Sequence, residues 1–183
     1  MQYDLIFAAA AVANKLKFLN DKDQVFLGAA YLYRQKRLIE GFDKVYGEHL
    51  SPLFEGGIAA CLEGSVKALA QLKEVEGNIP DTEEFGEQEG AYAQNLLIAL
   101  LYLIKFSSSG QFEDFEQSVS SAINNIDLIN YEKDELYDEK AVAQEEISVL
   151  VFIMDELVKR GEGVMKISVL ASVLASVCNG YML

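Results

Sequence analysis

The stretch LLIALLYLI, residues 96–104, is apolar on every face that a helix would present. In a protein without a membrane span, such a helix must be surrounded by other elements. We therefore predict a buried central helix over about 89–107. This run and the apolar run at 167–178 are both too short to cross a bilayer.

Helical periodicity recurs along the whole chain, and the alternation typical of strands is almost absent. Two runs space their apolar residues by three and four positions, as one helix face does. They are Phe112, Phe115, Val119, Ala122, Ile126 and Ile129, and then Ala143, Ile147, Leu150, Met154 and Leu157. We predict a single all-α domain over 1–183, a bundle of about seven or eight helices around the central helix.

Cap and turn residues set the expected helix boundaries. The other helices are expected at about 3–19, 21–38, 42–46, 51–76 and 164–178. Asn20 and Ser51 are the predicted N-caps, the latter followed by Pro52. Gly56-Gly57 predicts a kink or break, and helix ends are expected at Gly77, before Pro80, and at Gly161 and Gly163. Arg34, Lys36 and Arg37 are expected to complement a helix C-terminus.

The net charge of −14 is the strongest global signal. It disfavours binding to nucleic acid and to anionic membranes, and it favours a basic protein partner. An acidic protein with no special partner is the simpler interpretation. The N-terminal run MQYDLIFAAAAVANK lacks a basic region, with Asp4 where a signal peptide would have Lys or Arg, so we predict a cytoplasmic protein. Cys61 and Cys178 are expected to be free buried thiols rather than a disulfide.

No motif predicts a catalytic, cofactor or metal site, and we predict that the protein is not an enzyme. The single histidine, His49, has neither a Glu-x-x-His pair nor zinc-ligand spacing around it. A calcium loop starting at Asp81 would need oxygen ligands at positions five and twelve, where Phe85 and Tyr92 stand. There is no phosphate-binding glycine motif. Carboxylate chemistry, with or without a divalent metal, stays an open alternative.

Two acidic segments with interleaved aromatic residues are the candidate partner-binding regions. Carboxylates beside aromatic side chains suit a surface that binds a basic protein. The simpler interpretation is that they are helix starts and solvated loops, where the helix dipole favours carboxylates. Phe85 is expected to anchor the first turn. The candidates are Asp81, Glu83, Glu84, Phe85, Glu87 and Glu89, and then Tyr131, Glu132, Asp134, Glu135, Tyr137, Asp138 and Glu139.

Small residues recur along the last expected helix. Ser168, Ser172 and Ser176 are spaced by four, with Ala171 and Ala175 beside them. This spacing favours close helix packing inside the fold. The alternative is a homodimer formed through the C-terminal helix.

The region around the first acidic segment resembles the YjaG-like bacterial family, a domain of unknown function. The resemblance covers about 16–165. The resemblance rests on three features: an acidic turn that contains an aromatic residue, a helix with an alanine-rich start, and a later helix that contains a serine and an aspartate. The residues are Asp81, Thr82, Glu83, Glu84, Phe85, Ala91, Ala93, Gln94, Asn95, Ser121, Ile126 and Asp127, with Phe26, Tyr33, Arg34 and Phe42 nearer the N-terminus. Gln94 or Asn95 stands where that family has an aspartate, the family's tryptophans are absent, and the last helix is unlike its polar ending. The resemblance implies an all-α cytosolic bacterial protein and no particular activity.

Two functions are expected from these features. The first is a non-enzymatic immunity protein, which neutralises a bacterial toxin, for example a basic nuclease, by direct binding. The second is a housekeeping YjaG-like protein, acting as a homodimer through its last helix.

Overall fold

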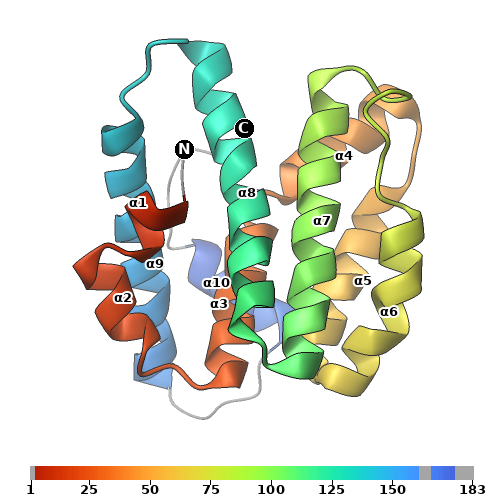
Figure 1. Ribbon diagram of the computed structural model, residues 1–183. Helices are drawn as coiled ribbons and strands as arrows, with labels where there is room; N and C mark the ends of the chain where they lie inside the picture. Colours follow the sequence, from red (N-terminus) through yellow and green to blue (C-terminus); the bar gives the residue numbers. More distant parts are fainter. Residues whose placement is uncertain (1–2, 161–165, 176–183) are drawn as a thin grey trace.

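Ten helices make up the described part of the chain, residues 3–160 and 166–175 of a computed structural model (Figure 1). No strand occurs within these residues, so the all-α prediction is confirmed. The helix number is higher than the predicted seven or eight, because the expected 3–19 and 51–76 helices are each divided in two. The helices are α1 Tyr3–Phe7, α2 Ala10–Leu16, α3 Asp21–Tyr33, α4 Lys36–Tyr46, α5 Leu50–Glu63, α6 Ser65–Gly77, α7 Gln88–Ser109, α8 Phe112–Lys133, α9 Glu139–Arg160 and α10 Ile167–Ala175.

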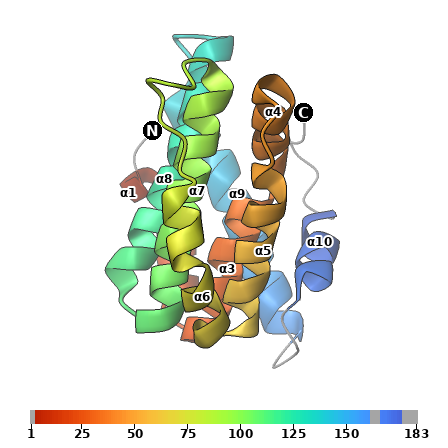
Figure 2. The same ribbon diagram turned by 90° about the vertical axis from the view of Figure 1, so that its right-hand side faces the viewer.

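The predicted central helix is α7. It packs against α3, α4, α5, α6 and α8 but lies with α8 in the outer layer of the bundle (Figures 1 and 2). Asn95, Ile98 and Tyr102 are therefore only half-buried. Leu96, Leu97, Leu100, Leu103 and Ile104 are all fully buried. The apolar run thus forms the core, as its lack of a polar face predicted.

Both predicted apolar seams lie on long helices, but these two helices pack against different partners. The α8 seam is buried from Phe115 to Ile129 and packs mainly on α7. Phe112, in the first turn of α8, stays 39% exposed. The α9 seam faces α1, α2 and α3 instead of its sequence neighbour α8. The N-terminal helices therefore lie against α9 (Figure 1).

The break predicted at Gly56-Gly57 is wrong, since α5 runs through both glycines. A Cβ on Gly57 would lie 2.7 Å from Cδ2 of Leu100, so this glycine allows α7 to approach closely. The chain turns instead at Gly64, whose φ of 125° suits glycine. The predicted end at Gly77 is confirmed. Gly161 and Gly163 lie outside the described residues.

The N-cap predicted at Asn20 is confirmed, because its side chain accepts the Asp23 N–H at 3.0 Å. The cap predicted at Ser51 is wrong. Helix α5 begins at Leu50, and the carboxylate of Asp43 accepts the Leu50 and Ser51 N–H groups at 2.7 and 2.9 Å. A side chain from the end of α4 thus caps the next helix.

The charge of Arg34 has a different role from the one predicted. The side chain is buried at the end of α3 and pairs with Glu146 of α9, rather than only complementing a helix C-terminus. The helix expected at 21–38 also ends at Tyr33, and α4 begins three residues later.

The small residues of α10 face outward, contrary to the expectation that they pack inside the fold. Ser168, Ala171, Ser172 and Ala175 are exposed, while Leu170, Val173 and Leu174 are buried. Ser176 lies outside the described residues. No helix in the described part of the chain is long and apolar enough to cross a membrane.

Cys61 is buried and its thiol is free. Burial raises its pKa to about 12. Cys178 lies outside the described residues, so its state stays a prediction.

Candidate protein-binding surface

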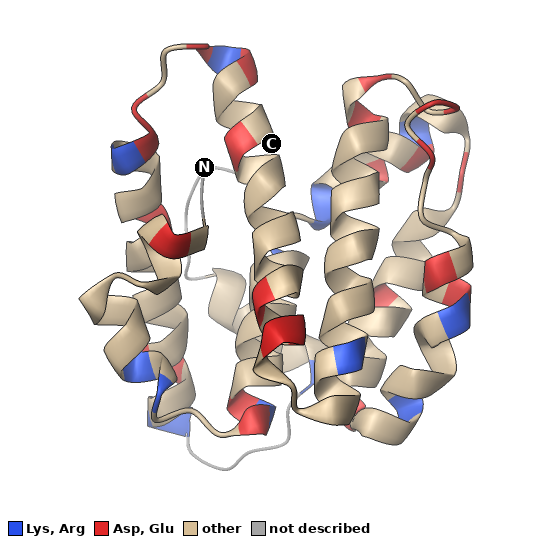
Figure 3. Ribbon diagram, viewed as in Figure 1, with Lys and Arg blue, Asp and Glu red and all other residues tan. Residues whose placement is uncertain are grey.

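The two predicted acidic segments lie at the same end of the bundle, although they are about fifty residues apart in sequence. One precedes α7 and the other follows α8, and these helices pack side by side and antiparallel (Figure 1). Acidic residues are dense along this end in Figure 3. We call the surface formed by 81–89 and 131–139 the acidic end.

The first segment is held in place by its own backbone and by Asp81. The Asp81 carboxylate accepts the Glu83 N–H at 2.9 Å, and the backbone carbonyl of Asp81 accepts the Phe85 N–H at 2.8 Å. Asp81 thus shapes the turn, while Glu83 and Glu84 extend exposed from it. Glu87 takes the N-cap position of α7 and Glu89 lies in its first turn, where the helix dipole favours carboxylates.

Phe85 anchors this turn, as predicted. Its ring packs against Phe42 and Tyr46 of α4, with centroid distances of 5.1 and 5.0 Å. The Tyr46 hydroxyl also accepts the Glu87 N–H at 2.9 Å. These contacts use the half-buried Phe85 side chain to fix the loop. The surface that remains for a partner is therefore carboxylate-rich.

Two aspartates of the second segment also have local structural roles. Asp134 accepts the Leu136 N–H at 2.9 Å. Asp138 accepts the Lys140 and Ala141 N–H groups at 3.0 and 3.1 Å, which caps the start of α9. Glu135 is exposed, and Glu139 lies half-buried in the first turn of α9.

The tyrosines of this segment differ in exposure. Tyr131 is 50% exposed, so its ring can contact a partner. Tyr137 is half-buried, and its hydroxyl donates a hydrogen bond to Asp127 of α8. Of the two, Tyr131 is the better candidate for a contact.

Leu136 is a surface residue that the sequence did not single out. It is 91% exposed and is surrounded in sequence by charged residues. It is the only aliphatic residue in YEKDELYDEK, and it falls outside both apolar seams. An isolated leucine in a charged loop is therefore the sequence signal that could have predicted an exposed apolar residue here. A partner that covered this segment would bury a large apolar side chain among carboxylates.

A hydrogen bond joins the two helices that carry the segments. The Tyr92 hydroxyl in α7 donates to the Glu132 carboxylate near the end of α8. Burial, followed by this bond, raises the pKa of Tyr92. The phenol therefore stays protonated at neutral pH and donates the hydrogen bond that links α7 to α8 at the acidic end.

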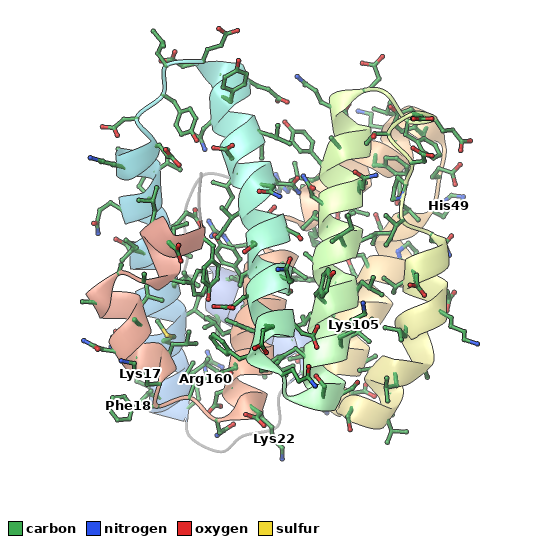
Figure 4. The ribbon with its side chains drawn as sticks, viewed as in Figure 1. Lys17, Phe18, Lys22, His49, Lys105 and Arg160 are labelled. Atoms are coloured by element: carbon green, nitrogen blue, oxygen red, sulfur yellow. The ribbon has the colours of Figure 1, made fainter. Side chains whose placement is uncertain are left out.

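Several basic side chains lie away from the acidic end. Figure 4 shows Lys17, Lys22 and Arg160 near the opposite end, where the exposed Phe18 also lies. His49 is exposed just before α5, as a turn residue. Lys133 lies within the second segment and Lys140 directly follows it, but the carboxylates of the segment outnumber these two lysines.

The described residues contain no group of three or more His, Cys, Asp or Glu side chains that could hold a metal ion. The carboxylates of the acidic end instead spread over two loops and two helix starts.

No protein-family model, no curated protein and no solved structure matches this chain. The relationship to the YjaG-like family stays a prediction. The all-α architecture that it implies is observed, but unrelated proteins share such architectures.

Proposed function

We propose that the protein is a non-enzymatic binding protein that captures a basic protein partner at its acidic end. The observation that carries this is the placement of Leu136. It is an aliphatic side chain, 91% exposed, within the second acidic segment, and that segment lies at the same end of the bundle as the first. Charge alone would attract many cations, whereas burying Leu136 adds a contact that requires a matching apolar surface on the partner.

The most specific form of this proposal is an immunity protein, acting in the bacterial cytoplasm on a toxin. A nuclease toxin has a basic cleft for its phosphate substrate. The exposed carboxylates of Glu83, Glu84 and Glu135 resemble that substrate in charge. They would speed association and cover the cleft.

The test is to find whether a toxin domain is encoded next to this gene, and to measure the binding of such a domain by calorimetry. We expect the affinity to fall roughly tenfold or more from about 50 to about 300 mM NaCl, because salt screens exposed charges. Affinity that does not change with salt contradicts the electrostatic mechanism.

Matched variants locate the surface. Glu83→Lys/Glu84→Lys is expected to slow association, and Leu136→Ala to speed dissociation, at a cost of about 1–2 kcal/mol. Glu113→Lys, an exposed carboxylate at the other end of α8, is the control and should bind like the wild type. If Glu113→Lys slows association as much, per unit of charge changed, as Glu83→Lys/Glu84→Lys does, only net charge matters.

A second candidate is the housekeeping YjaG-like protein that forms a homodimer. It is favoured by the outward face of α10, where Ala171, Ser172 and Ala175 are exposed. Small residues at this spacing let two helices approach closely. Ala171→Glu should then convert a dimer to a monomer, as measured by light scattering. Lys166→Glu, at the exposed residue directly before α10, is the control and should leave the dimer intact. A protein that is already monomeric rules this candidate out.

A further inference from the structure

A cavity of about 330 Å³ lies away from the acidic end, between α1, α2 and the first turns of α8. Its volume is at the lower end of the range for small-molecule sites, roughly 300–1,000 Å³. Ten residues from four helices and the segments beside them line it, among them Tyr3, Phe7, Leu16 and Phe112. No residue of the acidic end contributes.

The apolar part of the cavity is aromatic. The rings of Tyr3 and Phe7 are stacked, with centroids 4.6 Å apart and planes 3° from parallel. The Phe112 ring stacks on the buried Phe115 ring, with centroids 5.5 Å apart, and Phe112 remains 39% exposed. Aromatic faces offer a flat contact to an apolar ring and attract a cation by their quadrupole.

Two carboxylates stand beside these rings. Asp4 comes from α1 and Glu116 from α8, and within the described residues neither forms an ion pair. Glu116 is half-buried and lies against the Tyr3 hydroxyl. Burial and this carboxylate raise the pKa of Tyr3, which therefore stays a donor. One phenol does not use all the acceptor capacity of two carboxylates.

The remaining polar lining is an acceptor and one cation. The Gln24 amide donates to the Leu19 carbonyl at 3.1 Å, which leaves its own carbonyl oxygen as a further acceptor. Lys17 is exposed at the outer side of α2 (Figure 4). The cavity thus combines aromatic walls with an excess of acceptors.

We propose that this cavity is a binding site for a small organic ammonium ligand with an aromatic or similar apolar body. The ring would lie on Phe112 beside Tyr3, because Phe7 is only 3% exposed and is covered by Tyr3. The ammonium group would donate to Glu116 and Asp4. A ligand that also carried a carboxylate would reach Lys17. This is a second function, independent of partner binding at the acidic end.

The probe is phenethylamine, titrated into the full-length protein and followed by two-dimensional NMR. Saturable shifts at residues of the cavity are expected. Phenylacetate has the same ring with the opposite charge, and it should bind at least about tenfold more weakly. Phenylalanine binding as well as phenethylamine supports the ammonium site and adds a role for Lys17. Equal binding of phenylacetate, or no saturable shift with the amine, overturns the proposal.

Variants separate the site from non-specific attraction to an acidic protein. Glu116→Gln keeps the side-chain shape and should weaken phenethylamine binding about fivefold or more. Phe112→Ala, at a partly exposed ring, should weaken it severalfold without unfolding the protein. Glu113→Gln removes a neighbouring charge outside the cavity and should have no effect. If Glu113→Gln and Glu116→Gln weaken binding equally, only surface charge is responsible and the proposal fails.

Discussion

Arg34 and Glu146 form a buried, bidentate ion pair that joins the end of α3 to α9. Nη1 lies 2.6 Å from Oε2, and Nη2 lies 3.1 Å from Oε1. Their side chains are only 6% and 1% exposed. The Tyr31 hydroxyl donates a further hydrogen bond to Oε2 at 2.8 Å, so the carboxylate is well solvated by protein groups. This contact helps to hold α9 on the bundle.

Removing one partner of this pair should be strongly destabilising. Arg34→Met leaves a buried carboxylate without its counter-charge, so we expect a loss of about 3–5 kcal/mol in the free energy of unfolding. Urea denaturation followed by circular dichroism measures it. The double variant Arg34→Met/Glu146→Leu should recover much of the loss, because no charge then stays buried.

Lys36→Met is the matched control for this pair. Lys36 interacts with Glu40 and Glu55, but these side chains are 36–47% exposed. Exposed pairs contribute about 0–1 kcal/mol. An Arg34→Met protein as stable as Lys36→Met would show that the buried pair contributes little.

Gly90 should not tolerate alanine, although alanine favours helices. A Cβ there would lie 1.9 Å from the Phe85 carbonyl oxygen, so the backbone of the first acidic segment would have to move. We expect Gly90→Ala to destabilise the protein by about 1–3 kcal/mol and to weaken partner binding. Gly86→Ala, in the same loop with no close contact, is the control for thermal unfolding. Equal stabilities would contradict the close approach.

Asp43→Ala should uncap α5. The carboxylate accepts two backbone N–H groups and the Ser51 hydroxyl, so its loss should cost about 1–2 kcal/mol. Ser51→Ala removes one of these three bonds and should cost less. Chemical denaturation of both variants provides the measurement. If Ser51→Ala is the more damaging, Ser51 rather than Asp43 is the main cap.

The buried thiol of Cys61 predicts a loss of stability in alkali. Its pKa is about 12 in the folded protein, whereas an exposed thiol has a pKa of about 8.5. Above the lower value the unfolded state loses a proton that the folded state keeps. The free energy of unfolding should then fall by about 1.4 kcal/mol per pH unit, and this effect should be absent below about pH 8.

Urea titrations between about pH 8.5 and 10 test this slope. Cys61→Ala should have a shallower dependence than the wild type, because the titrating group is gone. Parallel pH profiles for the two proteins would show that Cys61 does not contribute.

Local patterns in the amino-acid sequence are enough to predict much of this fold. Apolar spacings of three and four, the run at 96–104, the Asn20 cap and the anchoring role of Phe85 are all recognisable from the sequence alone. Helical periodicity and capping depend on residues within one or two turns of each other. The acidic character of 81–89 and 131–139 is also a local property.

The remaining features depend on residues that are distant in sequence. Arg34 meets Glu146 across 112 positions, Asp43 replaces Ser51 as the cap, and Gly57 serves the approach of Leu100 instead of breaking a helix. Helix packing also places both acidic segments at one end, leaves Leu136 exposed there, and forms the cavity between Phe7 and Glu116. The spacing of apolar residues shows that a helix has a buried face, but the choice of the helix that covers it depends on side-chain fit across the whole bundle.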